Sequence, residues 1–294
     1  YGAPYLHIHR ADLVETLARE AQAAGVRVRT GARVAGHVDE AGAPLRVGLD
    51  TGEVVEGDLL VGADGLRSRT RVQLMGLDEA RYTGCVAWRF TTPLAGVQPP
   101  PAEGVATVWT GPGRHAVTYR LRNGTLANFV GVVKDEEPGA ESWSEAGSLD
   151  TLKRDFADFA EPVRALIAAA SSCMRWALYD RDPLSFWSRG RVALLGDACH
   201  PLPPTQAQGA ALALEDAAVL GRLLAGAEGE LAPKLQRFEA LRKPRASKVL
   251  SSARANLELF HRAHPAARLA AHGPMQMADR LLPALVAGRQ DWIY

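Results

Sequence analysis

The sequence predicts an α/β fold in which one layer, built from both ends of the chain, is interrupted by an inserted mainly β domain. Three observations predict this class. Short apolar strands run into helices near residue 60 and again near residue 195. β-Branched and aromatic residues concentrate between Tyr82 and Val133, in segments separated by Pro/Gly turns, and almost everything after Gln208 has a helical pattern.

The elements follow from the pattern in chain order. Apolar residues at helical spacing predict a helix over 11–24, with Gly25 as its C-terminal stop. Two strands joined by the turn-rich DEAGAP are expected next, then a short buried strand. A helix, another strand and a helical C-terminal part, interrupted at Pro244, Pro265, Gly273 and Pro283, complete the chain. The ranges of the expected strands are 26–38, 45–55, 58–61 and 187–195, and the helix covers 152–170.

Composition excludes several classes of protein. The 294 residues carry a net charge of +1, which gives no sign of binding to nucleic acid or an anionic membrane. No apolar run approaches the roughly 20 residues that span a bilayer. Three widely spaced cysteines argue against a disulfide framework and predict a cytoplasmic protein. Because the chain opens with Tyr1 and enters a helical pattern at once, we interpret it as the interior of a longer gene product.

The segment GRVALLGDACHPLPPTQAQGAALALEDAAVL predicts a ligand site at a strand-to-helix bend. Asp197 follows a buried-type strand, where open α/β sheets bind ligands, and its carboxylate can accept hydrogen bonds from hydroxyl groups. Gln208, Gly209 and Ala210 begin the next helix, whose unpaired N–H groups and positive dipole favour a negative ligand atom. The alternative is an ordinary strand–loop–helix connection with an incidental aspartate.

A second segment, DLLVGADGLRSRTR, has the same order of strand, tight turn and helix start, with Ser68 as the expected cap. Asp64 and Gly65 form its turn. One such motif is common in turns, but two that each place Gly and Asp at a strand end are much less expected by chance. The alternative for both aspartates is a turn or capping role.

GADGLRSRTR resembles the second sequence motif of the single-component FAD-dependent aromatic hydroxylases, and GDACHPLPPTQAQGAALALEDAAVL resembles the third. HIHRADLVETL resembles the segment where that family places an arginine near the flavin. The similarity continues through CVAWRF, VWTGPGRHAVTYRL and ALYDRDPLSFW. It is strongest to the branch that contains salicylate hydroxylase, 3-hydroxybenzoate 6-hydroxylase and 6-hydroxynicotinate 3-monooxygenase.

The resemblance implies an FAD-binding Rossmann-like layer from residues 1–75 and 179–228, incomplete at its N-terminus. A β-rich substrate domain over 76–178 and a C-terminal helical region over 229–294 complete the implied organisation. The FAD-contacting residues implied by the resemblance are Arg10, Val34, Asp64, Gly65, Gly196, Asp197, Gln208, Gly209 and Ala210.

The family's Gly-x-Gly-x-x-Gly motif has no proper counterpart. GPGRHA matches a relaxed form of the letters, but a strand follows it where a helix is required, so we interpret it as a hairpin turn. The missing cradle would lie upstream of Tyr1, and the chain alone is then expected to bind FAD poorly.

The strand HAVTYRL places His115 and Tyr119 on one face. We predict that these two orient and help deprotonate a substrate hydroxyl, with a core histidine and a packing tyrosine as the alternative. Arg89 and Arg120 could pair with a substrate carboxylate, although surface ion pairs are the expected role of each.

The implied reaction is hydroxylation of a phenolic or hydroxy-heteroaromatic acid with NADH or NADPH and O2, through a C4a-hydroperoxyflavin. Alternatives are a flavin oxidoreductase of the same fold that does not hydroxylate rings, and a non-catalytic fragment unable to hold FAD. No metal site is expected: Cys199 and His200 are adjacent without an evident third ligand, and His261, His264 and His272 are expected on a solvated helix face. A monomer or homodimer is expected.

Overall fold

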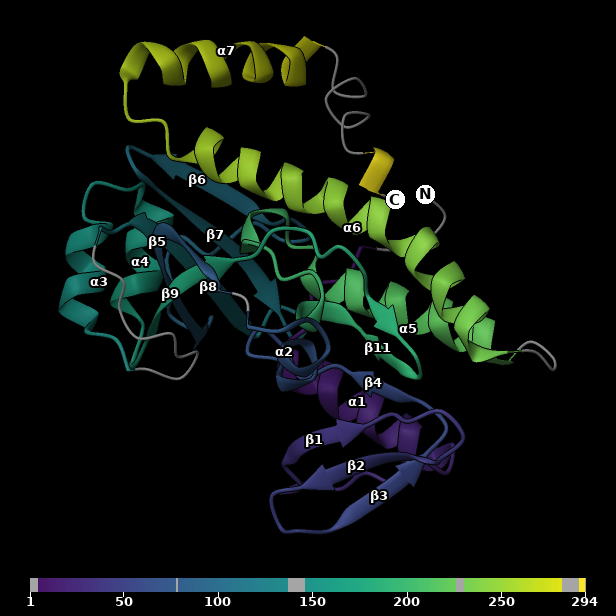
Figure 1. Cartoon of the computed structure of the whole chain (residues 1–294). Coiled ribbons are helices and arrows are strands. Elements are labelled where there is room, and N and C mark those ends of the chain that lie inside the picture. The colour runs from purple at the N-terminus through teal and green to yellow at the C-terminus, as the bar shows by residue number, and fades with distance from the viewer. Residues whose placement is uncertain (1–4, 78, 137–145, 226–229, 282–290, 294) are drawn as a thin grey trace. The chain divides into compact units, whose positions relative to one another are not determined.

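The computed structural model describes the chain except for residues 1–4, 78, 137–145, 226–229, 282–290 and 294 (Figure 1). The chain forms two compact units, each assembled from separate stretches. Unit 1 contains residues 1–28, 82–178 and 258–294, and unit 2 contains residues 29–81 and 179–257. The assignment of cofactor and substrate roles to four segments stays a prediction.

Unit 1 is built on a five-stranded sheet with the strand order β6-β7-β8-β5-β9. The strands are β5 (Arg81–Pro93), β6 (Thr107–Gly111), β7 (Arg114–Leu121), β8 (Leu126–Lys134) and β9 (Met174–Asp180). Gly111 and Arg114 flank a two-residue turn between β6 and β7, so GPGRHA is a hairpin turn, as predicted.

One face of this sheet is covered by α3 (Leu149–Asp155) and α4 (Glu161–Ala168), which lie along it in Figure 1. Trp88, Phe129 and Phe156 form the centre of the core between them. We call this the covered face. Because side chains alternate along a strand, residues next to these core positions point to the opposite side. That side, which we call the second face, carries Arg89, Val117, Tyr119, Asn128 and Val130.

Three further helices lie wholly or partly in unit 1: α1 (Arg10–Ala23), the end of α6 (Leu231–Phe260) and α7 (Pro265–Leu281). The predicted helix over 11–24 is thus confirmed. Asp12 on α1 accepts two hydrogen bonds from Arg122, at 2.9 and 2.6 Å. None of the described helices is both long and apolar enough to cross a bilayer.

Unit 2 contains two small sheets. One is the antiparallel meander of β1 (Val34–Val38), β2 (Leu45–Leu49) and β3 (Val54–Gly57). In the other, β11 (Val192–Leu194) pairs in parallel with β4 (Leu60–Gly62) and antiparallel with β10 (Ser188–Arg189). Residues distant in sequence therefore become neighbours in one sheet.

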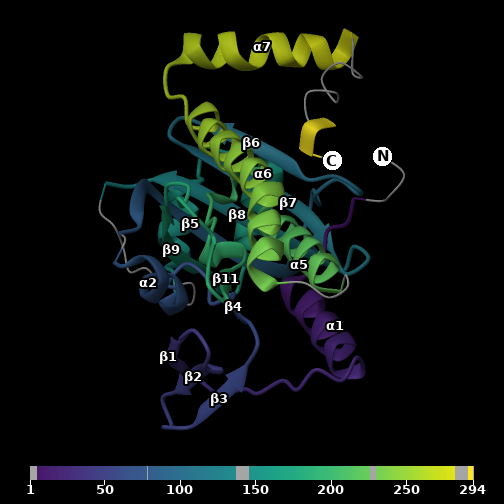
Figure 2. The same ribbon diagram turned by 45° about the vertical axis from the view of Figure 1, so that its right-hand side comes forward.

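The helices of unit 2 are α2 (Arg69–Met75), α5 (Gly209–Ala225) and most of α6, with the short turns η1 (Gly196–Ala198) and η2 (Pro204–Gln206) between β11 and α5. Both α5 and α6 lie beside β11 in two views (Figure 1 and Figure 2). The apolar cluster that joins them includes Leu194, Leu220 and Phe238. This packing fixes where α5 begins relative to the end of β11.

Several element boundaries differ from prediction because of local turns. The strand expected over 26–38 is limited to Val34–Val38, and the one expected over 45–55 is divided at Gly52, whose φ of +86° makes a turn. The helix expected over 152–170 is two helices. The strand expected over 187–195 is divided at Gly190, with φ +59°.

The predicted helix interruptions are partly wrong. Pro244 lies inside α6, where buried neighbours on both sides hold the helix together despite one missing backbone hydrogen bond. Gly273 lies inside α7, and Pro265 begins that helix. Pro283 lies outside the described residues.

Gly131 on β8 tests the packing of the covered face. A Cβ at this position would lie 2.5 Å from Cζ of Phe156 and 2.9 Å from Cε1 of Phe129. Gly131→Ala should therefore lower the free energy of unfolding by about 1–3 kcal/mol through overpacking. Urea unfolding of the wild type and the variant measures this change in the free energy of unfolding. The control is Gly221→Ala in α5, whose Cβ meets no atom within 4 Å and should stabilise by about 0.5–1 kcal/mol. Equal effects at both positions would contradict this packing.

Candidate functional site

The bend between β11 and α5 brings a carboxylate next to the start of a helix. Asp197 is exposed just beyond the carboxyl end of β11. A Cβ placed on Gly209, the first residue of α5, would lie 4.0 Å from Oδ1 of Asp197. The N–H of Leu212 bonds to the carbonyl of Gln208, so the N–H groups before it have no partner within the helix. The two ends of the predicted site therefore lie next to each other.

The rest of the bend is held in an unusual backbone conformation. Gly196 has φ +62°, which suits glycine, whereas Ala207 has φ +53°, in the left-handed region that alanine rarely adopts. Such a conformation costs about 1–3 kcal/mol and is concentrated at functional sites. Gln208 is buried and Ala210 is exposed. The left-handed backbone conformation of Ala207 directs the chain into the first turn of α5.

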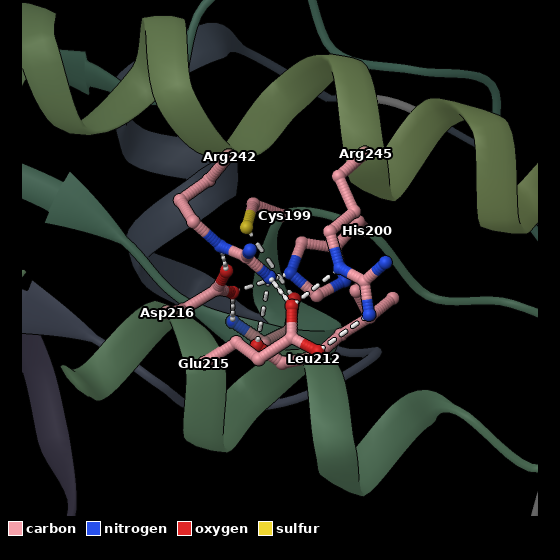
Figure 3. A network of polar contacts seen from close by, with 8 residues as sticks. Cys199, His200, Leu212, Glu215, Asp216, Arg242 and Arg245 are labelled. Carbon is pink, nitrogen blue, oxygen red and sulfur yellow. Dashed lines mark hydrogen bonds and ion pairs between the residues drawn. The ribbon is translucent and has the colours of Figure 1, made fainter. Parts of the chain in front are cut away.

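A buried ion-pair network centred on Asp216 connects this bend to α5 and α6 (Figure 3). Asp216 is fully buried on α5, and its Oδ1 accepts a hydrogen bond from Nε of Arg242 on α6 at 2.7 Å. Its Oδ2 lies 2.5 Å from Nε2 of His200 and 3.2 Å from the backbone N of Gly196. One carboxylate thus ties both helices to the turn that carries Asp197.

The charge states of this network follow from its contacts. Burial alone would raise the pKa of Asp216, but hydrogen bonds and charges from His200 and Arg242 outweigh it and hold the pKa below its ordinary value. Because an ionised carboxylate only accepts hydrogen bonds, Nε2 of His200 must carry a proton. Glu215 extends the network to Arg245, with two contacts of 2.6 Å (Figure 3).

Cys199, His200 and Asp216 lie close enough together to hold a metal ion in principle. The third group that sequence reasoning did not find is Asp216. Its oxygens, however, already engage Arg242, whose guanidinium stays charged. Burial and the nearby carboxylates raise the pKa of the Cys199 thiol well above its usual value, which disfavours a thiolate ligand. The donor set is therefore better suited to an ion-pair network than to a metal.

The second motif is placed at the start of α2. Asp64 accepts hydrogen bonds from Ser68 Oγ and from the backbone N and Oγ1 of Thr70, the last two at 3.1 Å. Ser68 accepts from the N of Arg71 at 2.9 Å, which confirms the predicted cap. Partial burial raises the pKa of Asp64, but these hydrogen bonds outweigh it and lower the pKa. Asp64 therefore serves the helix terminus, whatever further role it has.

Three other predicted residues are more scattered. Gly65 has φ +77° and no atom within 4 Å of a Cβ built there. Val34 begins β1, and its carbonyl accepts from Nη1 of Arg69 at 3.4 Å. Arg10 is exposed at the start of α1 and belongs to unit 1, whereas the other predicted cofactor residues belong to unit 2. All nine cofactor assignments stay predictions.

His115 lies on β7 but is almost fully buried, with 1% exposure. Its Nδ1 is 2.7 Å from Nε2 of His261, near the end of α6. His261 is 2% exposed, so the expected solvated position of this histidine is wrong. Burial lowers the pKa of His115 to about 3 and that of His261 to about 4, so both are neutral near pH 7. The catalytic role of His115 stays a prediction.

Tyr119 lies further along the same strand and is half-buried. Its ring centroid is 4.7 Å from that of His7, whose Nε2 is buried without a hydrogen-bond partner. Burial raises the pKa of Tyr119, and the positive charge of Arg89 opposes that rise. Sequence reasoning missed His7. It also missed Asn128, a polar residue in the apolar alternation of LANFVGVVK.

Comparisons place this chain among known proteins. Residues 3–253 match the family described as FAD binding domain. A 3-amino-4-hydroxybenzoate 2-monooxygenase of Streptomyces cremeus is 37% identical over 263 residues, which cover 89% of this chain and 64% of the relative. A 6-hydroxynicotinate 3-monooxygenase of Bordetella bronchiseptica is 37% identical over 255 residues, which cover 85% and 65%.

Among solved structures, a salicylate hydroxylase substrate complex matches with a TM-score of 0.79 at 27% identity. That match covers 97% of this chain and 72% of the other. The chain spans just under two thirds of the length of the two curated relatives, at 64% and 65%.

Removing one partner of the buried ion pair should destabilise unit 2. Arg242→Met leaves the charge of Asp216 buried without compensation, and the free energy of unfolding should fall by about 3–5 kcal/mol. Arg245→Met removes a half-exposed pair and should cost about 1 kcal/mol or less. Urea unfolding of both variants, with Asp216→Leu/Arg242→Met, measures this. The network is contradicted if the double variant is no more stable than Arg242→Met.

The buried histidine pair should make stability depend on pH. As the pH falls below 6.5, both histidines become protonated in the unfolded chain. In the folded chain His261 is protonated only near pH 4 and His115 only near pH 3. The free energy of unfolding should therefore have its full value above pH 6.5. Below pH 6.5 it should fall by about 1.4 kcal/mol per pH unit for each histidine. The double variant His115→Leu/His261→Leu should lose this part of the slope. An unchanged slope would contradict the pairing.

Proposed function

The chain belongs to the FAD binding domain family, and on that premise we propose that it holds FAD and takes part in hydroxylating a phenolic or hydroxy-heteroaromatic acid with NADH or NADPH and O2. Membership confirms the family resemblance predicted from the two Gly/Asp motifs. The observation that carries the proposal is the position of Asp197 beside the first residue of α5: a Cβ built on Gly209 would lie 4.0 Å from its Oδ1.

The residues at this bend fit a flavin. Apart from its chain neighbours and the backbone of its own helix, the one atom of the described residues within 4 Å of a Cβ built on Gly209 is Oδ1 of Asp197, at 4.0 Å, so the backbone there has room for a flat ring. The N-terminus of a 17-residue helix offers N–H groups and a positive dipole end. These favour the negative charge that a reduced flavin carries at its pyrimidine edge.

Each residue then has a distinct role in the proposed complex. Asp197 would accept hydrogen bonds from the ribityl hydroxyls, and Gln208, Gly209 and Ala210 would face the ring. Asp64, bound to the start of α2, would support the pyrophosphate region from its helix terminus. Val34, Arg10, Gly65 and Gly196 complete the proposed set. When bound, FAD would accept hydride from NAD(P)H and activate O2.

The substrate side is proposed on the second face of the sheet in unit 1. Tyr119 is half-buried there and would orient the substrate hydroxyl. The Nδ1 of His115 already contacts His261, which supports a positioning role for this histidine in place of direct proton transfer. A buried and neutral pair of this kind would hold β7 in register without adding charge near a phenolate.

We also propose a cytoplasmic location and a monomer or homodimer. The three cysteines are buried and free, which supports a reducing compartment. Size-exclusion chromatography with light scattering separates monomer from homodimer.

Titration with FAD tests the cofactor proposal. Wild-type chain should bind FAD weakly, as the sequence predicts, and quench flavin fluorescence with saturation at high chain concentration. Asp197→Asn should weaken that binding a further 10- to 100-fold, roughly, because charge-assisted hydrogen bonds are lost. The matched control is Asp58→Asn, an exposed aspartate of unit 2 that should leave binding unchanged.

Product analysis separates the alternatives. NAD(P)H oxidation that is stimulated by 6-hydroxynicotinate, salicylate or 3-amino-4-hydroxybenzoate, with a hydroxylated product by mass spectrometry, supports the proposal. Oxidation of NAD(P)H without a hydroxylated ring would favour the flavin oxidoreductase instead. A chain that does not bind FAD at all would be the non-catalytic fragment.

A further inference from the structure

The second face of the unit 1 sheet differs from the covered face in what it carries. The covered face is packed with Trp88, Phe90 and Phe129 against α3 and α4. On the second face, Val117 and Val130 lie opposite each other and are only half-buried. Two apolar side chains are therefore left partly exposed on this face of the sheet.

Asn128 lies on this face with a side chain whose hydrogen bonds are not made. The residue is 0% exposed, and both Nδ2 and Oδ1 are buried without a partner. Buried side-chain polar atoms nearly always have a partner, because an unpaired one costs about 1–3 kcal/mol. An amide left unsatisfied at both ends needs one group that accepts and one that donates. A ring hydroxyl can do both.

Arg89 is the second unusual group on this face. It is half-buried on β5, yet it has no hydrogen-bond or ion-pair partner among the residues that the structure describes. The other arginines on the strands of this sheet all have partners. Arg120 donates to the carbonyl of Pro101 at 2.7 Å, and the other three form ion pairs: Arg114 with Asp158, Arg81 with Asp180, and Arg175 with Asp135. Arg120 is therefore occupied, whereas the Arg89 guanidinium is available to an anion from outside the chain.

These groups are arranged at a spacing that suits one small aromatic ring. Arg89, Val130 and Val117 lie opposite one another in one row across three strands. Asn128 and Tyr119 lie opposite each other in the next row. Neighbouring rows on one face are two residues apart, about 6.6 Å along the strand. A ring over the two valines would therefore have a cation at one end and an amide and a phenol at the other.

We propose that Arg89 and Asn128 form the specificity site of the substrate, Arg89 binding its carboxylate and Asn128 bonding its ring hydroxyl or ring N–H and carbonyl. The inference rests on the proposed function and names the substrate class: a flat aromatic acid whose polar ring substituent lies away from the carboxylate. The guanidinium fork matches a carboxylate through two parallel hydrogen bonds. Tyr119 and His7 close the amide end of the site.

The chemistry excludes neutral aromatic compounds as good ligands. Without a carboxylate, the ligand would leave Arg89 half-buried and, as far as the described residues go, unpaired. Without a hydrogen-bonding ring substituent, both atoms of Asn128 would stay unsatisfied. Specificity of this kind, in which the wrong ligand leaves buried polar groups unpaired, discriminates strongly.

Binding of acids and their amides tests Arg89. The FAD-loaded chain is titrated by calorimetry with 6-hydroxynicotinate and 3-amino-4-hydroxybenzoate, whose hydroxyl lies opposite the carboxylate, with salicylate, whose hydroxyl is adjacent to it, and with the neutral amide of each. Arg89→Gln should weaken binding of the acid that binds wild type roughly 10- to 100-fold, and change binding of its amide less than about 3-fold. Arg89→Lys should recover only part of the loss. Arg120→Gln, the matched control, should leave both unchanged.

Stability together with affinity tests Asn128. Because the amide is unsatisfied, Asn128→Leu should keep or raise the thermal unfolding midpoint of the ligand-free chain. The same change should weaken acid binding roughly 10-fold or more. A purely structural asparagine predicts the reverse pattern, a lower midpoint with unchanged affinity, and that result would overturn its assignment.

The outcomes distinguish this inference from the proposed function. If FAD binds and none of the three acids does, or if Arg89→Gln weakens acid and amide equally, the specificity site is wrong while the cofactor proposal stands. If FAD does not bind, the proposed function fails. The specificity site is then tested on the FAD-free chain, by comparing how Arg89→Gln changes binding of the acid and of its amide.

Discussion

The carboxylate of Asp216 is the constraint on which unit 2 depends. It contacts the turn after β11 through Gly196 and His200, and the helix α6 through Arg242. A buried ion pair contributes little net stability compared with an apolar substitute, so specificity is its better explanation. The observed arrangement of these elements satisfies the carboxylate. That arrangement leaves Asp197 exposed next to the first residue of α5.

The polar groups of the two units have complementary character. In unit 2 the buried carboxylate of Asp216 is paired with Arg242 and His200, and the exposed Asp197 lies next to the start of α5. In unit 1 the second face holds polar side chains that the described residues leave unsatisfied. The paired network fixes the bend where we propose the cofactor, and the unsatisfied groups lie where we propose the substrate.

Much of the fold could be predicted because its signals are local. The strand-to-helix bends, the Ser68 cap and the β6–β7 hairpin all follow from residues adjacent in sequence. Asp216 could have been found from its place on the apolar stripe of α5, four residues from both Leu212 and Leu220, which are buried. Its partner Arg242 could not, because that contact depends on how two helices pack. The burial of His261 depends likewise on β7, far away in the chain.

The parallel pairing of β4 with β11 has a consequence for synthesis on the ribosome. When the nascent chain has emerged as far as Leu178, β5, β6, β7 and β8 can already pair with one another, because all four lie between Arg81 and Lys134. Among the described residues, β4 pairs only with Val192–Leu194, which is synthesised later. Within this part of the chain, β4 therefore lacks its partner strand while the inserted sheet folds, and an unpaired strand edge is prone to aggregation. Slow translation between β4 and β11 would lengthen the time during which β4 lacks this partner strand. Fast folding of the inserted sheet would not shorten that time.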